Sequence, residues 1–198
     1  IPEVENKEEF AGWLKTIKGK FVLSSMYQPS GRPDYNWEKF ATEKSLEKIR
    51  KERQEAARKW SANFRKMGVN RRNINNTLEE AGAIGLLSNN WAGGFGANRI
   101  FSAGTKNIPN IDLRLEDYTM LYRMVKNGVN PKVKVVSTSK DLGIVPTFNT
   151  LAMIKGVEKP EEYVILSAHF DSWDGATGAT DNGTGTVVMM EAMRILKA

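Results

Sequence analysis

The sequence predicts an α/β fold in two domains, residues 1–130 and 131–198. Short apolar runs with strand character alternate with segments of helical periodicity along the chain. A long amphipathic helix, about residues 38–68, interrupts that alternation. Near the C-terminus, an apolar run, a glycine-rich polar loop and a helix follow one another. Such alternation is typical of a sheet with helices on its faces.

The first domain begins with a predicted helix, Glu8–Thr16, and a predicted strand, Lys20–Ser24. In the long helix that follows, apolar residues recur at three- and four-residue steps, and Gly68 supplies the stop signal. We expect this apolar stripe to cover another part of the chain. The stripe consists of Leu46, Ile49, Ala56, Ala57, Trp60, Phe64 and Met67.

The opposite face of this helix carries much of the chain's net charge of +6. A basic face is compatible with nucleic-acid binding, but Glu43, Glu47, Glu52 and Glu55 are interspersed, and mixed charges are typical of a solvated helix face. We therefore expect no nucleic-acid partner. No apolar run reaches membrane-spanning length, and the lack of cysteine excludes disulfides and thiolate metal sites.

The rest of the first domain continues the alternation and includes a loop rich in glycine and asparagine. The glycines at 93, 94 and 96 lack a nucleotide-binding pattern, so we expect a surface loop whose Trp91 and Phe95 are not site residues. The predicted elements are a helix at Asn73–Ala81, a strand at Ala83–Ser88, the loop at Asn89–Thr105, a strand at Ile111–Leu113 and a helix at Glu116–Lys126.

Three extended segments of the second domain are predicted to be neighbouring strands: Val133–Ser137, Thr147–Lys155 and Glu162–Ala168. The last is a short apolar run after Pro160, which favours a buried strand. A loop containing Gly175, Gly178, Gly183 and Gly185 follows, and then a predicted helix at Thr186–Lys197.

The chain's only histidine, His169, lies at the carboxyl end of this predicted buried strand. Asp171 follows two residues later, and Asp181 precedes the last helix. Imidazole and carboxylate are common zinc ligands, and Asp171 is spaced to orient the ring rather than to bind metal. The sequence thus predicts half of a metal site, and the alternative is a capping aspartate and a partly buried histidine in a glycine-rich turn.

This strand, the motifs H-F-D-S-W-D and G-A-T-D-N-G-T-G, and the final helix resemble the catalytic core of metallopeptidase family 28, di-zinc exopeptidases, and most closely its carboxypeptidase Q-like members. The resemblance implies that His169 binds one zinc ion and that Asp181 bridges two. It also implies that Asp171 orients His169 without binding metal.

The first domain resembles a protease-associated domain, a module inserted in the catalytic domain of related exopeptidases. The resemblance covers about residues 18–129 and is carried by K-G-K-F-V-L-S, E-E-A-G-A-I-G-L-L-S-N-N and I-P-N-I-D-L. The long basic helix is then an insertion in that module. The order of the two resemblances along the chain is the order that carboxypeptidase Q-like enzymes show.

The implied function is hydrolysis of terminal peptide bonds by a secreted or periplasmic metallopeptidase with two zinc ions and a peptide substrate, as an aminopeptidase, carboxypeptidase or dipeptidase. Family members continue into a Glu-Glu pair, a further Asp and a His. Because these 198 residues do not supply that set, we expect the chain to be a fragment that is inactive alone and binds zinc weakly or not at all.

Two further expectations concern partners. Unpaired strand edges in the second domain predict a homodimer or strand exchange. The alternative function is a non-catalytic module in which the protease-associated portion binds a peptide or a protein.

Overall fold

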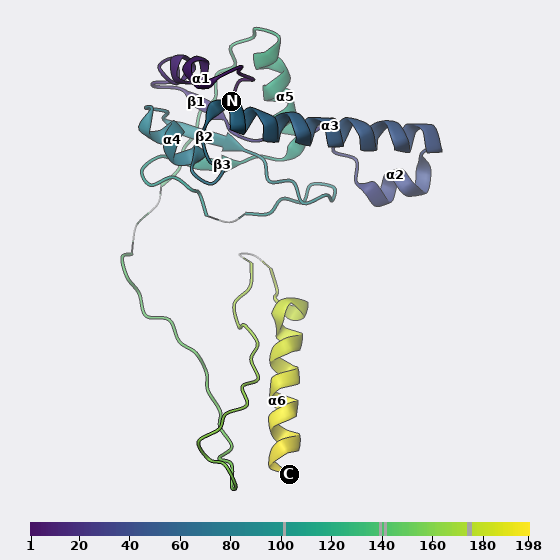
Figure 1. Ribbon diagram of the computed structural model, residues 1–198, viewed down its shortest axis with the longest axis vertical. Coiled ribbons are helices and arrows are strands. Elements are labelled where there is room, and N and C mark those ends of the chain that lie inside the picture. Colours follow the sequence, from purple (N-terminus) through teal and green to yellow (C-terminus); the bar gives the residue numbers. More distant parts are fainter. Residues whose placement is uncertain (101, 139, 141, 174–175) are drawn as a thin grey trace. The chain divides into compact units, whose positions relative to one another are not determined.

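Strand β2 is the centre of a three-stranded parallel sheet in the computed structural model (Figure 1). β2 (Gly85–Ser88) pairs with β1 (Phe21–Leu23) on one side and with β3 (Asn110–Asp112) on the other. All four residues of β2 are buried. The α/β fold class is therefore confirmed for this part of the chain.

The structure describes residues 1–100, 102–138, 140, 142–173 and 176–198. The chain divides into two units, Ile1–Ser139 and Lys140–Ala198, called here the N-terminal and C-terminal units. Phe101 of the predicted loop and Asp174 and Gly175 of the predicted metal loop lie outside the described residues. No helix in the described part is both long enough and apolar enough to cross a membrane.

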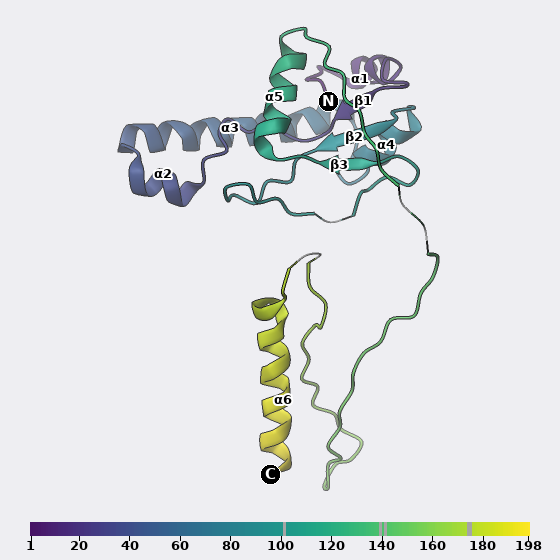
Figure 2. The same cartoon turned by 180° about the vertical axis from the view of Figure 1, so that it is seen from behind.

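Helices cover both faces of the sheet, with α3 and α4 on one face and α5 on the other (Figures 1 and 2). The predicted helices near Glu8 and Asn73 are confirmed as α1 (Lys7–Leu14) and α4 (Ile74–Glu80). The α3–α4 face holds the main core because the apolar sides of these helices meet the sheet there. This core consists of Val4, Phe10, Ile17, Val22, Phe64, Met67, Ile74, Leu78, Ala83 and Leu86.

Helix α3 (Glu43–Met67) confirms the predicted long helix. The side chain of Thr42 accepts a hydrogen bond from Ser45 N, which caps the first turn, and Gly68 ends the helix with a left-handed φ of 68°. Phe64 and Met67, at the end of the predicted stripe, are buried in the core. The C-terminal part of the apolar stripe thus packs into the core, which confirms the expectation that it covers another part of the chain.

A short helix that the sequence analysis missed, α2 (Asp34–Phe40), packs beside α3 (Figure 1). Arg53 of α3 fixes its position: the guanidinium pairs with Asp34 and donates to the carbonyl oxygen of Arg32 at 2.6 Å. The same guanidinium lies 5.1 Å from the ring centroid of Trp91, in the loop after β2. One arginine of α3 therefore contacts both α2 and the loop after β2.

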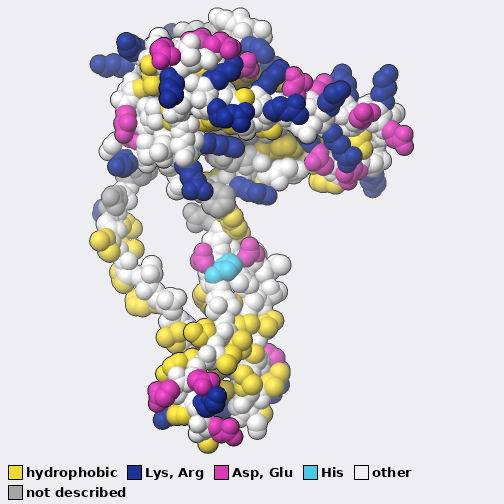
Figure 3. Space-filling model, in the orientation of Figure 1, with side chains coloured by type: hydrophobic (Ala, Val, Ile, Leu, Met, Phe, Trp, Pro, Cys, Tyr) yellow, Lys and Arg dark blue, Asp and Glu magenta, His cyan; other side chains and the backbone are white. Residues whose placement is uncertain are grey.

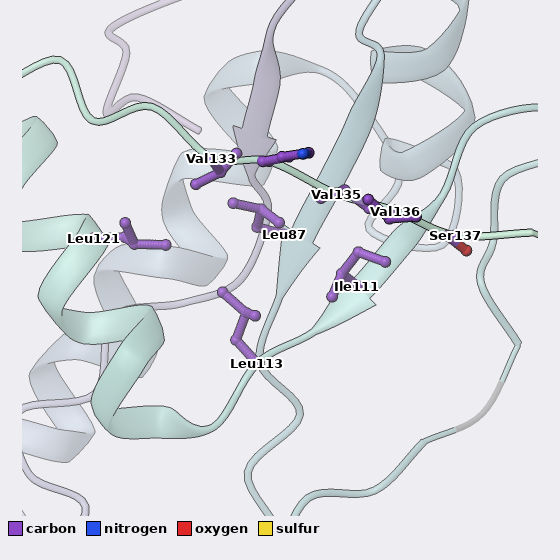
Figure 4. Close-up of a pocket in the computed structure, with 9 residues that line it drawn as sticks. Leu87, Ile111, Leu113, Leu121, Val133, Val135, Val136 and Ser137 are labelled. Atoms are coloured by element: carbon purple, nitrogen blue, oxygen red, sulfur yellow. The ribbon is translucent and has the colours of Figure 1, made fainter.

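The second face of the sheet is covered by α5 (Leu115–Lys126) and by residues 133–137, which cross over Leu87 and Ile111 (Figure 4). A cavity of about 480 Å³ lies between them. The prediction of a strand at Val133–Ser137 is wrong, since this segment joins no ladder. Its alternation still places Val133 and Val135 half-buried and Val136 exposed, so the pattern reflects one-sided burial without strand pairing.

The C-terminal unit ends in η1 (Ala179–Gly183) and α6 (Thr184–Lys197), which confirms the last predicted helix. The strands predicted at Thr147–Lys155 and Glu162–Ala168 are wrong: their described residues pair with no strand, and Val164 is 93% exposed. A single strand is not stable without partners for its N–H and C=O groups and without cover for its apolar face. Hydrophobic side chains are therefore spread over this unit's surface (Figure 3).

Tyr118 of α5 allows a test of how the packing of α5 on the sheet stabilises the N-terminal unit. Its side chain is fully buried, and its hydroxyl donates to the carbonyl oxygen of Ser25 at 2.6 Å and accepts from Ser25 N at 2.8 Å. Tyr118→Phe should lower the free energy of unfolding of the N-terminal unit by about 1–3 kcal/mol, because both backbone groups of Ser25 lose their partner. Urea unfolding followed by tryptophan fluorescence measures this loss.

Tyr122→Phe is the matched control, since Tyr122 lies on the same helix. Its ring stacks on the ring of Tyr27, with the two ring centroids 4.8 Å apart. Its replacement should change the free energy of unfolding much less. Equal effects of the two substitutions would contradict the role given to the Tyr118 hydroxyl.

Candidate metal site

The turn before α6 positions Asp181 through local contacts. The side chain of Asn182 accepts a hydrogen bond from Gly185 N at 3.1 Å and so caps the first turn of α6. A Cβ atom at position 185 would collide with the end of the Asn182 side chain, so glycine leaves room for this hydrogen bond. Asp181 and Asn182 have non-helical backbone angles. Asp181 therefore projects from the turn and not from the helix.

Gly178 sets the approach to this turn. Its φ is 67°, in the left-handed region, and a Cβ atom there would lie 2.9 Å from Cβ of Ser172. This close approach brings the segment that carries His169 and Asp171 back beside the turn that carries Asp181. The glycines of the motif thus have a structural reason independent of any ligand.

His169 lies between two carboxylates. Its Nδ1 is 3.2 Å from Oδ1 of Asp171 and 3.1 Å from the Asp171 carbonyl oxygen. Its Nε2 is 2.9 Å from Oδ1 of Asp181. The histidine and acidic side chains gather at the surface of the C-terminal unit (Figure 3). The structure therefore brings together all three residues that the sequence analysis singled out.

These contacts determine the chemistry of the imidazole. The hydrogen bond to the Asp171 carbonyl, together with the charges of Asp171 and Asp181, raises the pKa of His169 above its ordinary value. A protonated ring satisfies both carboxylates. A neutral ring with its proton on Nδ1 directs the Nε2 lone pair at Asp181, the arrangement that a metal-binding histidine needs.

The residue types and their placement fit a zinc ion. Histidine nitrogen and carboxylate oxygen bind zinc at about 2.0–2.2 Å, so two ligands of one tetrahedral ion lie about 3.4 Å apart. The distance of 2.9 Å between Nε2 and the Asp181 oxygen needs to increase by only about half an ångström. Side-chain rotation can supply this change, because the side chains of His169 and Asp181 are 51% and 71% exposed.

The pair provides only part of a coordination sphere. Across the described residues, no group of three or more His, Cys, Asp or Glu side chains is placed to hold a metal ion. Asp171 lies on the Nδ1 side of the ring, away from Nε2, which suits an orienting residue and not a ligand. The separate roles of His169, Asp171 and Asp181 stay predictions. The capping role of Asn182 was missed, although Asn three residues before Gly185 was a visible signal.

Comparison with known proteins agrees with the motif. Residues 149–198 match the sequence model of Peptidase family M28. Carboxypeptidase Q from Homo sapiens is 34% identical over 97 residues, which cover 49% of this chain and 21% of that protein. Carboxypeptidase Q from Xenopus laevis is 36% identical over 90 residues, covering 46% of this chain and 19% of that protein.

A relative with a different name is Leucine aminopeptidase 2 from Trichophyton equinum, 31% identical over 118 residues, or 59% of this chain and 23% of that protein. The matches to carboxypeptidase Q thus span about a fifth of the length of those relatives. No solved structure matches the chain. The resemblance to family 28 and to its carboxypeptidase Q-like members is confirmed.

Nuclear magnetic resonance tests the geometry around His169 directly, because the chain has one histidine and hence one set of imidazole signals. In chelator-treated protein, the pKa of His169 should lie above that of a histidine in a short peptide. Asp171→Asn and Asp181→Asn should each lower this pKa, since each removes a negative charge that favours the protonated ring.

Glu191→Gln should leave the His169 pKa unchanged, because Glu191 pairs with Arg194 on α6. A raised pKa also means that the contacts of the ring stabilise the folded loop at acid pH, and that this contribution is lost as the pH rises through the folded-state pKa. An unshifted His169 would contradict the arrangement of the two carboxylates.

Proposed function

Because residues 149–198 resemble peptidase family M28, we propose that this chain supplies part of the active centre of a metal-dependent exopeptidase that hydrolyses terminal peptide bonds. The observation that supports the proposal most is the placement of His169, with Asp181 at one ring nitrogen and Asp171 at the other. The relatives are named as carboxypeptidases and aminopeptidases. Exopeptidase is therefore the reaction class common to them.

In this proposal His169, through Nε2, and Asp181, through its carboxylate, would hold zinc, with Asp181 as the ligand shared by two ions. Bound zinc ions would supply the Lewis acidity that lowers the pKa of water and stabilises negative charge on a peptide carbonyl. Asp171 keeps the Nδ1 proton of His169 in place, which fixes the tautomer and the orientation of the ring. Asn182 holds Asp181 at the start of α6.

The proposed centre also needs a general base and further metal ligands, since the described residues place no third ligand near His169 and Asp181. We therefore expect the 198-residue chain alone to be inactive and to bind zinc weakly or not at all. The protease-associated character of the first domain, a secreted or periplasmic location and dimerisation through the C-terminal unit are further parts of the proposal. The exposed apolar side chains of that unit support the last of these.

A second function, a non-catalytic module that binds a peptide or protein, is favoured by one observation. The N-terminal unit has its own sheet and its own buried core, and neither includes His169 or Asp181. Such a unit can bind a partner whether or not the catalytic centre is complete.

Zinc titration by calorimetry tests the proposed ligands in the 198-residue chain. Wild-type protein should bind one zinc ion with low affinity, and His169→Ala or Asp181→Ala should abolish that binding. Asp171→Asn should weaken it about 10- to 100-fold, since an orienting partner is lost while both ligands remain.

Glu191→Gln provides a matched control, as it removes an exposed carboxylate from the same unit without touching the pair. Its zinc affinity should equal that of the wild-type protein. If His169→Ala and Asp181→Ala also leave zinc binding unchanged, the assigned ligands are wrong.

Activity is tested in a longer polypeptide that continues past Ala198, assayed with unblocked and end-blocked dipeptides. Asp181→Ala should abolish hydrolysis, because the proposed bridging ligand is lost, whereas Asp171→Asn should reduce hydrolysis less. Only unblocked termini should be cleaved. Full activity of Asp181→Ala would refute the proposed centre, and cleavage of peptides blocked at both ends would refute the exopeptidase class.

A further inference from the structure

The turn before α6 differs from an α-helix in the register of its backbone hydrogen bonds. The N–H of Gly183 donates to the carbonyl oxygen of Gly178 at 2.8 Å, and the N–H of Thr184 donates to that of Ala179. In both bonds the donor lies five positions after the acceptor, whereas the donor in an α-helix lies four positions after it. Wide turns of this kind are frequent at functional sites.

This register changes which group pairs with the carbonyl of Thr180. In an α-helix, the N–H of Thr184 would donate to that carbonyl oxygen. Here the N–H donates to Ala179, and the hydroxyl of Thr184 donates to the Thr180 oxygen at 2.7 Å. The hydroxyl therefore takes the place of a backbone donor that the wide turn uses elsewhere.

Thr77 of α4 shows that the same contact has a different meaning in a regular helix. The hydroxyl of Thr77 donates to the carbonyl oxygen of Asn73 at 3.1 Å, and the N–H of Thr77 donates to the same oxygen at 3.0 Å. Threonine side chains commonly make this contact in helices. At Thr77 the hydroxyl duplicates a backbone hydrogen bond, whereas at Thr184 it replaces one.

A second threonine acts on the other side of Asp181. The hydroxyl of Thr186 donates to the carbonyl oxygen of Asn182 at 3.3 Å. Because Thr180 and Asn182 are the two neighbours of Asp181, the first turn of α6 holds the carbonyl groups on both sides of it. The bond from Thr184 is the shorter of the two, so we assign it the larger share.

The backbone of Asp181 depends on this wide turn. Its φ of −117° and ψ of 90° are far from the helical values of about −63° and −42°. If the turn returned to the α-helical register, Asp181 would take helical angles and its side chain would point in another direction. The distance of 2.9 Å between its Oδ1 and Nε2 of His169 would then increase.

We propose that Thr184 is a positioning residue for the metal pair. Its hydroxyl stabilises the wide turn by pairing with the Thr180 carbonyl, and the wide turn directs Asp181 toward His169. Thr184 acts through Asp181 and binds neither metal nor substrate. This inference rests on the proposed function, since it concerns the same pair of residues.

Nuclear magnetic resonance of the chelator-treated 198-residue chain tests the proposal, with the imidazole signals of His169 as the readout. Thr184→Val removes the hydroxyl and keeps a side chain of similar shape. It should displace the His169 signals in the same direction as Asp181→Asn, because both weaken the contact between the two side chains. Thr184→Ser should restore the wild-type signals, since serine keeps the hydroxyl.

Two further substitutions calibrate this result. Thr186→Val should displace the His169 signals less than Thr184→Val, because its hydrogen bond is longer. Thr77→Val is the matched control, as it removes a hydroxyl whose acceptor keeps a backbone partner, and it should leave the signals unchanged.

Zinc titration of the longer polypeptide that continues past Ala198 gives a second readout. Thr184→Val should weaken zinc binding about 3- to 10-fold, the effect of one lost hydrogen bond at an exposed turn, and Thr184→Ser should restore it.

The proposal is overturned if Asp181→Asn displaces the His169 signals and Thr184→Val does not. It is also overturned if Thr184→Ser acts like Thr184→Val, because the hydroxyl is then not the cause. A longer polypeptide that neither binds zinc nor hydrolyses dipeptides would refute the proposed function, but it would not alter the signals of the metal-free chain. The two failures are therefore distinguishable.

Discussion

The parallel pairing of β2 with both neighbouring strands is the constraint on which the N-terminal unit depends. Side chains alternate along this strand, so Leu86 enters the main core under α3 and α4, while Leu87 faces the cavity beneath α5. A shift of one residue would exchange these two leucines and turn Ser88 to the opposite face of the sheet. Gly85 admits the ring of Phe21, its partner in the register, where a Cβ atom would collide. One short strand therefore fixes two packed faces and one cavity.

The predictable part of the fold was the part with local signals. Helix α3 has a continuous apolar stripe, a capping threonine and a terminal glycine, all readable within its own sequence. Helix α2 has only seven residues, and it is held by Arg53, about 20 positions later in the chain, and by the contact of Tyr35 with Phe95. Long-range contacts of this kind leave no local pattern, and short helices are marginal without them.

The strands predicted in the C-terminal unit were wrong for a related reason. An apolar run such as Glu162–Ala168 indicates what a segment would do inside a sheet, but it does not supply the neighbouring strand that makes a sheet. β2 has a similar apolar character and does form a strand, because β1 and β3 satisfy its backbone on both sides. Partners, and not propensity, distinguish the two segments.

The candidate metal site belongs to the predictable part of the structure. His169, Asp171 and Asp181 lie within thirteen residues of one another and are joined by a short glycine-rich turn, so their meeting was predictable from spacing. The contacts of Arg53 with Asp34 and Trp91 had no such local signal, because these residues lie far apart in the sequence. Sequence spacing contains no trace of that arrangement.

Because the contact between His169 and Asp181 is formed only by a short exposed turn, it is also weak. Asp171 is 89% exposed, and a charge–charge contact in water is worth little because solvent screens it. The turn therefore defines which atoms face each other, but it does not hold them rigidly. Covering the turn with apolar groups would lower the local dielectric, strengthen the contacts of His169 and raise the affinity for a cation. The geometry of the pair is thus set by these residues, whereas its affinity for metal depends on what covers them.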